Sequence, residues 1–136
     1  MGDEILEFAN QANAIDLKTV TDYSKSHGLF RRRNYFFLGR DNFLIIKISR
    51  IRIPFWGLGK DLYDLFNSLT KSRGNYFFVA LVSNKSGWVL SKEQLLSQIT
   101  DGSISYSANQ KQYKIHVSNL LFVQHLRGLA NSAISL

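Results

Sequence analysis

Cysteine is absent from this 136-residue chain. Its absence excludes disulfide bonds, thiol catalysis and thiolate metal ligands, and it is typical of proteins from a reducing compartment. The chain also lacks an apolar run near the roughly 20 residues that a membrane-spanning helix needs. Its first residues, Met1–Ile5, are acidic and have no apolar signal-peptide core. We therefore expect a cytoplasmic protein without a membrane partner.

Proline is also scarce, since Pro54 is the only one, and no low-complexity tract or linker divides the sequence. The length suits a single domain with a real core. The hydrophobic fraction of 45% and the charged fraction of 20% are ordinary for a globular protein. We expect one domain that spans residues 1–136.

Acidic residues are nearly absent from residues 31–60, where Asp41 is the only one. The same window holds eight basic residues: Arg31, Arg32, Arg33, Arg40, Lys47, Arg50, Arg52 and Lys60. Eight minus one is +7, which equals the net charge of the whole chain. Aromatic residues, Trp56 among them, are interleaved with these cations. This pattern favours a polyanionic partner, nucleic acid above all, and the alternative is a solvated basic face beside core aromatics.

Hydrophobic spacing predicts an alternation of helices and strands. In the first part of the chain we expect helices over 3–15 and 17–27, a β-hairpin from 34–38 and 43–53, and a loop over 55–59. A helix over 60–71 and strands over 76–83 and 88–90 should follow. The last part should contain a helix opened by Ser91 and Gln94, a strand over 112–117 and a helix over 120–126. The order is α-α-β-β-α-β-β-α-β-α. This order indicates an α+β or mixed α/β fold, a single layer with a central mixed β-sheet flanked by helices.

Lys47 interrupts the apolar strand predicted over 43–53. Side chains alternate between the two faces of a strand, so Lys47 shares its face with Phe43 and Ile45. A buried ammonium is costly unless it is paired, deprotonated or able to reach water. Its long stem commonly lets lysine reach water from a partly buried site.

The order of elements around Lys47 resembles a known superfamily. A helix, a hairpin whose second strand ends in lysine, a helix and a buried apolar strand follow one another over roughly residues 3–90. This order is similar to the core of the restriction-endonuclease-like PD-(D/E)xK proteins, with Phe43–Lys47 as the second strand and Lys60–Lys71 as the following helix. The resemblance implies a nuclease fold in which carboxylates hold a divalent metal and the lysine stabilises charge at the scissile phosphate.

The sequence departs from that family at the metal ligands. Ile45 stands where the family carries Asp or Glu, and Asp41 matches neither family carboxylate. A hard cation requires several oxygen ligands. The resemblance then implies a nucleic-acid-binding shell without chemistry, and we expect no catalytic residue, no metal site and no cofactor.

Three hypotheses follow. The first is a non-catalytic module that binds DNA or RNA through the eight basic residues above, with Trp56 as a stacking platform if its ring is exposed beside Arg50 and Arg52. The second is an active metal-dependent nuclease, in which Lys47 is catalytic and rearranged carboxylates (Asp22, Asp41 or Asp61) converge on it. The third is a protein-interaction or assembly subunit with an acidic partner.

Overall fold

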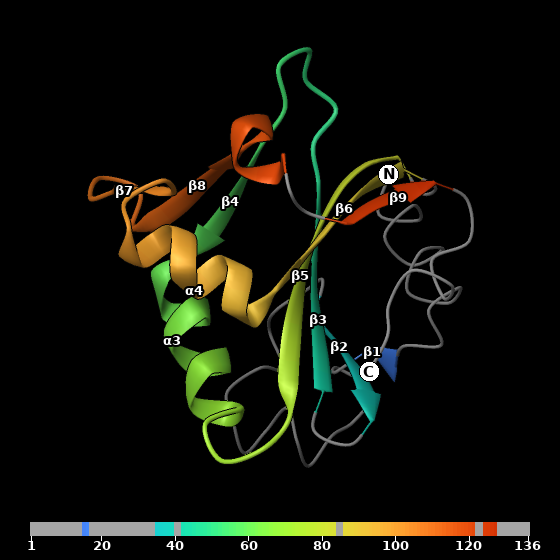
Figure 1. Cartoon of the computed structure of the whole chain (residues 1–136), viewed down its shortest axis with the longest axis vertical. Coiled ribbons are helices and arrows are strands. Elements are labelled where there is room, and N and C mark those ends of the chain that lie inside the picture. The colour runs from blue at the N-terminus through green and yellow to red at the C-terminus, as the bar shows by residue number, and fades with distance from the viewer. Residues whose placement is uncertain (1–14, 17–34, 40–41, 84–85, 122–123, 128–136) are drawn as a thin grey trace.

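The computed structural model describes residues 15–16, 35–39, 42–83, 86–121 and 124–127 (Figure 1). These residues form two β-sheets, two α-helices and one short 3-10 helix. The mixed α+β class expected from the sequence is therefore confirmed.

The large sheet has six strands in the order β1-β2-β3-β5-β6-β9. Its strands are β1 (Ile15–Asp16), β2 (Tyr35–Gly39), β3 (Asn42–Ile48), β5 (Asn75–Ser83), β6 (Ser86–Ser91) and β9 (Gln124–Arg127). Strands β3 and β5 run parallel, and the other neighbouring pairs run antiparallel. The predicted hairpin and the mixed character of the sheet are thus confirmed. A parallel pair requires a crossover connection, and residues 49–74 provide it.

The small sheet has three antiparallel strands in the order β4-β8-β7. They are β4 (Phe55–Gly59), β8 (Gln112–His116) and β7 (Ser105–Ser107). This sheet makes a second layer, so the expected single layer is not what the structure has. The cause is β4, which the sequence predicted as a loop because glycine at positions 57 and 59 suggests a turn.

Two helices match their predictions closely. Helix α3 (Lys60–Leu69) buries Leu62 and Phe66, and helix α4 (Lys92–Thr100) starts with the predicted capping box. Ser91 Oγ accepts a hydrogen bond from the Gln94 amide at 3.1 Å, and Gln94 Oε1 accepts one from the Ser91 amide at 2.8 Å. Two of the orphan amides of the first turn are satisfied in this way.

Other predicted elements differ from the structure. The strand predicted over 43–53 ends at Ile48, and the helix predicted over 120–126 is replaced by the 3-10 helix η2 (Val117–Leu120) and by β9. Pairing of β9 with β6 outweighs the local helical pattern there. The helices predicted over 3–15 and 17–27 lie outside the described residues, except that Ile15 and Asp16 form β1.

The core lies between one face of the large sheet and the second layer. Buried side chains of the large sheet meet Trp56, Leu58 and Ile115 of the small sheet, and they also pack against the buried residues of both helices. The ring of Phe66 packs edge-on against Phe43, with 5.5 Å between ring centroids. Both helices lie on the same side of the large sheet as β4 and β8 (Figure 1). None of the described helices is long and apolar enough to cross a membrane.

Candidate nucleic-acid interface

Residues 49–54, here called the crossover loop, connect β3 of the large sheet to β4 of the small sheet. The loop begins where the Ser49 amide donates to the Leu81 carbonyl at 2.9 Å. The next four residues, Arg50–Ile53, are all exposed, and Ile53 reaches 78%. The loop projects at one end of the long axis, and the turn between α3 and β5 lies at the other end (Figure 1). Two arginines are therefore carried at a protruding tip.

Strand β4 continues from this loop and alternates between two environments. Trp56 and Leu58 point into the core, where they are 2% and 0% exposed. Phe55 and the two glycines of β4 share the opposite face, because side chains alternate along a strand. Their register partners on β8 are His116, Lys114 and Gln112. We call this surface the outer face; its residues are Phe55, Gly57, Gly59, Ser105, Ser107, Gln112, Lys114 and His116, none of which is buried.

Two aromatic rings and an ammonium group meet on the outer face. The ring centroids of Phe55 and His116 lie 5.9 Å apart with an angle of 34° between the planes. Lys114 Nζ lies 5.4 Å from the Phe55 centroid, within the range of a cation–π contact. Gly57 leaves room for the Gln112 side chain, since a Cβ on Gly57 would lie 2.4 Å from Gln112 Oε1.

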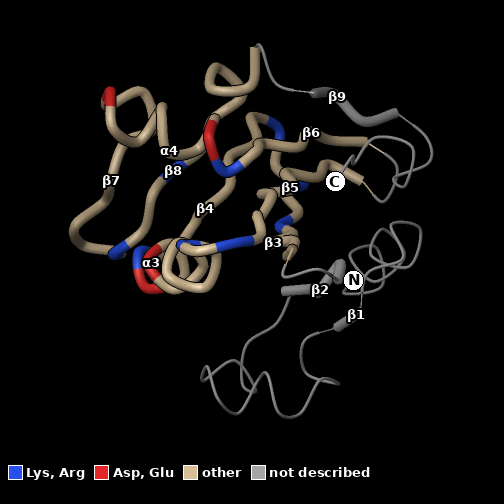
Figure 2. Tube along the Cα trace, turned by 60° about the horizontal axis from the view of Figure 1, so that its bottom comes forward, with Lys and Arg blue, Asp and Glu red and all other residues tan. Residues whose placement is uncertain are grey.

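The pairing of β4 with β8 brings together two segments of the chain that contain no acid. Residues 42–60 and residues 102–121 contain neither Asp nor Glu. Arg50 and Arg52 belong to the first segment, and Lys114 belongs to the second. Among the residues that Figure 2 colours by charge, the acidic ones lie on α3, on α4 and at the turn after α4. The charged residues of the crossover loop and the outer face are therefore all basic, and the Asp61 carboxylate lies at the end of the outer face away from the loop, where a Cβ on Gly59 would be 2.9 Å from its Oδ1.

The basic residues predicted from the sequence do not all gather at this surface. Lys60 starts α3, at the opposite end of β4 from Arg52. Its Nζ lies 2.6 Å from Asp64 Oδ2, and this bond raises the pKa of the exposed Lys60 ammonium. Arg31, Arg32, Arg33 and Arg40 lie outside the described residues. Lys114, which lies outside the basic window of the sequence, pairs in register with Gly57 of β4, the strand that follows the crossover loop.

Lys47 occupies the inner side of the large sheet. It pairs in register with Ala80 and shares its face with the fully buried Phe43 and Ile45. The side chain is partly buried, and desolvation lowers the pKa of its ammonium. Lys47 is thus partly buried on this face of the sheet, whereas Arg50 and Arg52 are exposed on the crossover loop.

Trp56 corrects an expectation. The ring was expected to stack on a base if it were exposed, but it is 2% exposed. Its Nε1 donates to the Leu81 carbonyl at 3.0 Å, and its ring packs against Trp88 with 5.9 Å between centroids. Strand alternation turns Trp56 inward and its neighbour Phe55, which is 37% exposed, outward. The accessible aromatic side chain of this strand is therefore Phe55.

Among the residues that the structure describes, no group of three or more His, Cys, Asp or Glu side chains is arranged to hold a metal ion. Ile45, which stands where the resemblance would require a carboxylate, is fully buried. Asp61 lies in the first turn of α3, where its Oδ1 accepts from the Leu62 amide at 2.8 Å. Asp22 and Asp41 lie outside the described residues.

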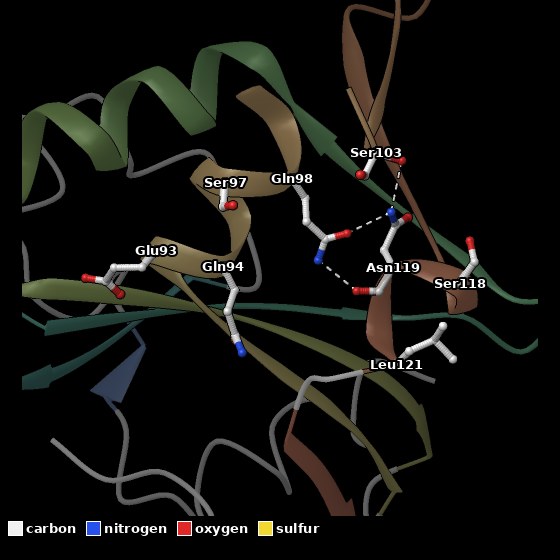
Figure 3. A pocket seen from close by; sticks show the side chains of 8 residues that line it. All are labelled: Glu93, Gln94, Ser97, Gln98, Ser103, Ser118, Asn119 and Leu121. Atoms are coloured by element: carbon white, nitrogen blue, oxygen red, sulfur yellow. Dashed lines mark hydrogen bonds between the residues drawn. The ribbon is translucent and has the colours of Figure 1, made fainter. Parts of the chain in front are cut away.

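A cavity of about 450 Å³ that is open to solvent and lined mostly by polar residues lies between α4 and η2 (Figure 3). Its wall contains Asn119, which is 7% exposed. Asn119 Nδ2 donates to Gln98 Oε1 and to the Ser103 carbonyl, both at 3.0 Å. Asn119 Oδ1 accepts from the His116 amide at 2.8 Å, and the Asn119 carbonyl accepts from Gln98 Nε2 at 2.8 Å. This network, which sequence analysis missed, ties the end of β8 to α4.

Comparison with known proteins gives no relative. No family model matches the chain, and no curated protein or solved structure matches it either.

Proposed function

We propose that this protein is a non-catalytic nucleic-acid-binding module whose contact surface is the crossover loop together with the outer face. The observation that supports this proposal is the union of two acid-free segments through the β4–β8 pairing. Arg50, Arg52 and Lys114 contribute positive charge there. A polyphosphate chain is the ligand that matches an extended surface on which cations lie beside aromatic rings.

The non-catalytic part of the proposal rests on Ile45. Its fully buried aliphatic side chain stands where the resemblance to restriction-endonuclease-like proteins requires an oxygen ligand. We therefore propose that any such core in this protein has lost its metal chemistry. A plasmid-nicking assay with Mg²⁺ and Mn²⁺ tests this point. Cleavage that disappears in Lys47→Ala would instead support an active nuclease that uses rearranged carboxylates.

The decisive experiment measures binding to a single-stranded oligonucleotide and to a duplex as a function of salt. The double variant Arg50→Gln/Arg52→Gln removes two charges from the crossover loop. Loss of two phosphate contacts should reduce the slope of log K against log salt by about 1.4 on the single strand and by about 1.8 on the duplex.

The matched control is Lys71→Gln/Arg73→Gln, which changes the net charge by the same amount. These residues are exposed and lie in the turn after α3, at the end of the molecule opposite the crossover loop (Figure 1). The control should keep the wild-type slope. Equal losses in the two double variants would mean that overall charge, and not this surface, drives binding.

An acidic partner protein is a second candidate. Ile51, Ile53 and Leu121 are 54%, 78% and 74% exposed, and apolar side chains beside arginines are common at protein interfaces. Absence of binding to any nucleic acid at about 50 mM salt, where electrostatic attraction is strong, would favour this candidate.

A further inference from the structure

We infer that the preferred ligand is a single-stranded nucleic acid and that the paired rings of Phe55 and His116 are the platform on which its bases stack. This inference rests on the proposed function and adds to it the class of nucleic acid and the residues that select it. Trp56, the aromatic residue that the sequence favoured for this role, is buried and cannot serve.

The first support is the placement of the two rings. Phe55 and His116 are directly opposite each other on neighbouring antiparallel strands, so both side chains leave the same face of the sheet. Both are exposed, with 5.9 Å between ring centroids. Two adjacent rings held on strands form a rigid surface for unpaired bases, because every base has a π-face.

The second support is the low relief of the surface around the rings. Along β4 the outer face continues as Gly57 and Gly59, and β7 contributes Ser105 and Ser107. The Gln112 side chain covers Gly57, where a Cβ would lie 2.4 Å from Gln112 Oε1, so it is the small side chains of Ser105 and Ser107 that let flat groups approach the strands. In a duplex the base faces are stacked on one another, so only its phosphates and groove edges would reach this surface.

The third support is the position of the cations relative to the rings. Lys114 Nζ lies 5.4 Å from the Phe55 centroid, and the arginines of the crossover loop precede Phe55 by three and five residues. A stacked base brings its phosphate near the edge of the ring that holds it. Lys114, which lies over the Phe55 ring, and the two arginines of the adjoining loop would supply the positive charge for the backbone of a strand whose bases lie on the rings.

The test compares three probes of similar length, each of about 12 nucleotides, a length within the range that single-strand-binding folds cover. They are an oligothymidine, an abasic oligonucleotide with the same phosphates, and a duplex. The oligothymidine should bind about 5- to 140-fold more tightly than the abasic strand, the range expected when one base stacks on a ring.

Phe55→Ala and His116→Ala should each weaken oligothymidine binding and leave binding to the abasic strand unchanged. Phe55→Leu, which keeps an apolar side chain without a π-system, should behave like Phe55→Ala and guards against loss of folding. Tyr106→Ala is the matched control, because Tyr106 is 43% exposed and lies on β7 outside the outer face. It should keep the wild-type preference.

The outcomes separate the two proposals. Equal wild-type affinity for the oligothymidine and the abasic strand overturns the stacking platform and leaves nucleic-acid binding intact. Tighter binding of the duplex than of the oligothymidine at the same salt also overturns it. Absence of binding to all three probes overturns the proposed function itself.

Discussion

Replacement of Asn119 by alanine should destabilise the protein by about 3 kcal/mol. The side chain makes three hydrogen bonds, to Gln98, to the Ser103 carbonyl and from the His116 amide. Each is worth about 1 kcal/mol net. The cavity of about 450 Å³ beside Asn119 lets water reach the groups left behind, so the larger penalty of fully buried orphan groups does not apply.

Urea denaturation followed by tryptophan fluorescence measures this loss, because Trp56 is buried and Trp88 packs against it. The midpoint should fall and the m-value should stay constant, since the same surface is exposed on unfolding. Ser97→Ala is the control: it changes an exposed residue that lines the same cavity and should alter stability by no more than about 0.5 kcal/mol.

A double-mutant cycle with Gln98→Ala sharpens the test. Asn119 and Gln98 are in direct contact, so the two losses should be non-additive by about 1 kcal/mol or more. Additive losses, or a loss below about 0.5 kcal/mol for Asn119→Ala alone, would refute the view that this network holds β8 against α4.

Two further predictions concern the core. Lys47→Met should stabilise the protein near neutral pH by about 0.5–1 kcal/mol. Desolvation lowers the pKa of Lys47 in the folded state below the ordinary value of 10.5. Between the folded-state pKa and 10.5, the unfolded chain therefore holds more protons than the folded protein, and the free energy of unfolding of the wild type rises with pH. The stability difference between Lys47→Met and the wild type should therefore shrink as the pH rises through that window. A difference between the two urea midpoints that is the same at every pH would contradict this prediction. Trp56→Phe should lower the free energy of unfolding by about 1–2 kcal/mol in the same assay. The Leu81 carbonyl loses the hydrogen bond from Trp56 Nε1 but keeps the one from the Ser49 amide at 2.9 Å. A loss above about 4 kcal/mol would mean that the Ser49 amide does not compensate for the missing donor.

Local patterns were enough to predict the elements that carry their own signals. Helix α4 follows from the Ser91 and Gln94 capping box, α3 follows from apolar residues at helical spacing, and β5 follows from its continuous apolar run. In each case local chemistry and tertiary packing favour the same structure, which is the condition under which sequence patterns predict well.

The small sheet could not be predicted in the same way. Strand β4 has the sequence Phe-Trp-Gly-Leu-Gly, in which glycine disfavours a strand. Its partner β8 lies more than 50 residues further along the chain, and no local rule encodes such a pairing. The excess of basic residues over residues 31–60 was visible from the sequence. The position of Lys114 opposite β4 and the inward orientation of Trp56, however, depend on this long-range pairing.

The exposed crossover loop has a consequence for limited proteolysis. Trypsin cuts after arginine, and the bonds after Arg50 and Arg52 lie in an exposed loop outside both sheets, the kind of site where nicking concentrates. A cut there should not release the N-terminal fragment. Strand β3 stays paired with β5 over seven register positions, and Phe43–Ile46 are all 0% exposed.

The nicked protein should therefore run as one species on a sizing column and separate only in denaturant. Two fragments expressed apart, 1–52 and 53–136, should reassemble by inserting β3 next to β5. The crossover loop is thus a natural point at which to split this protein into complementing halves.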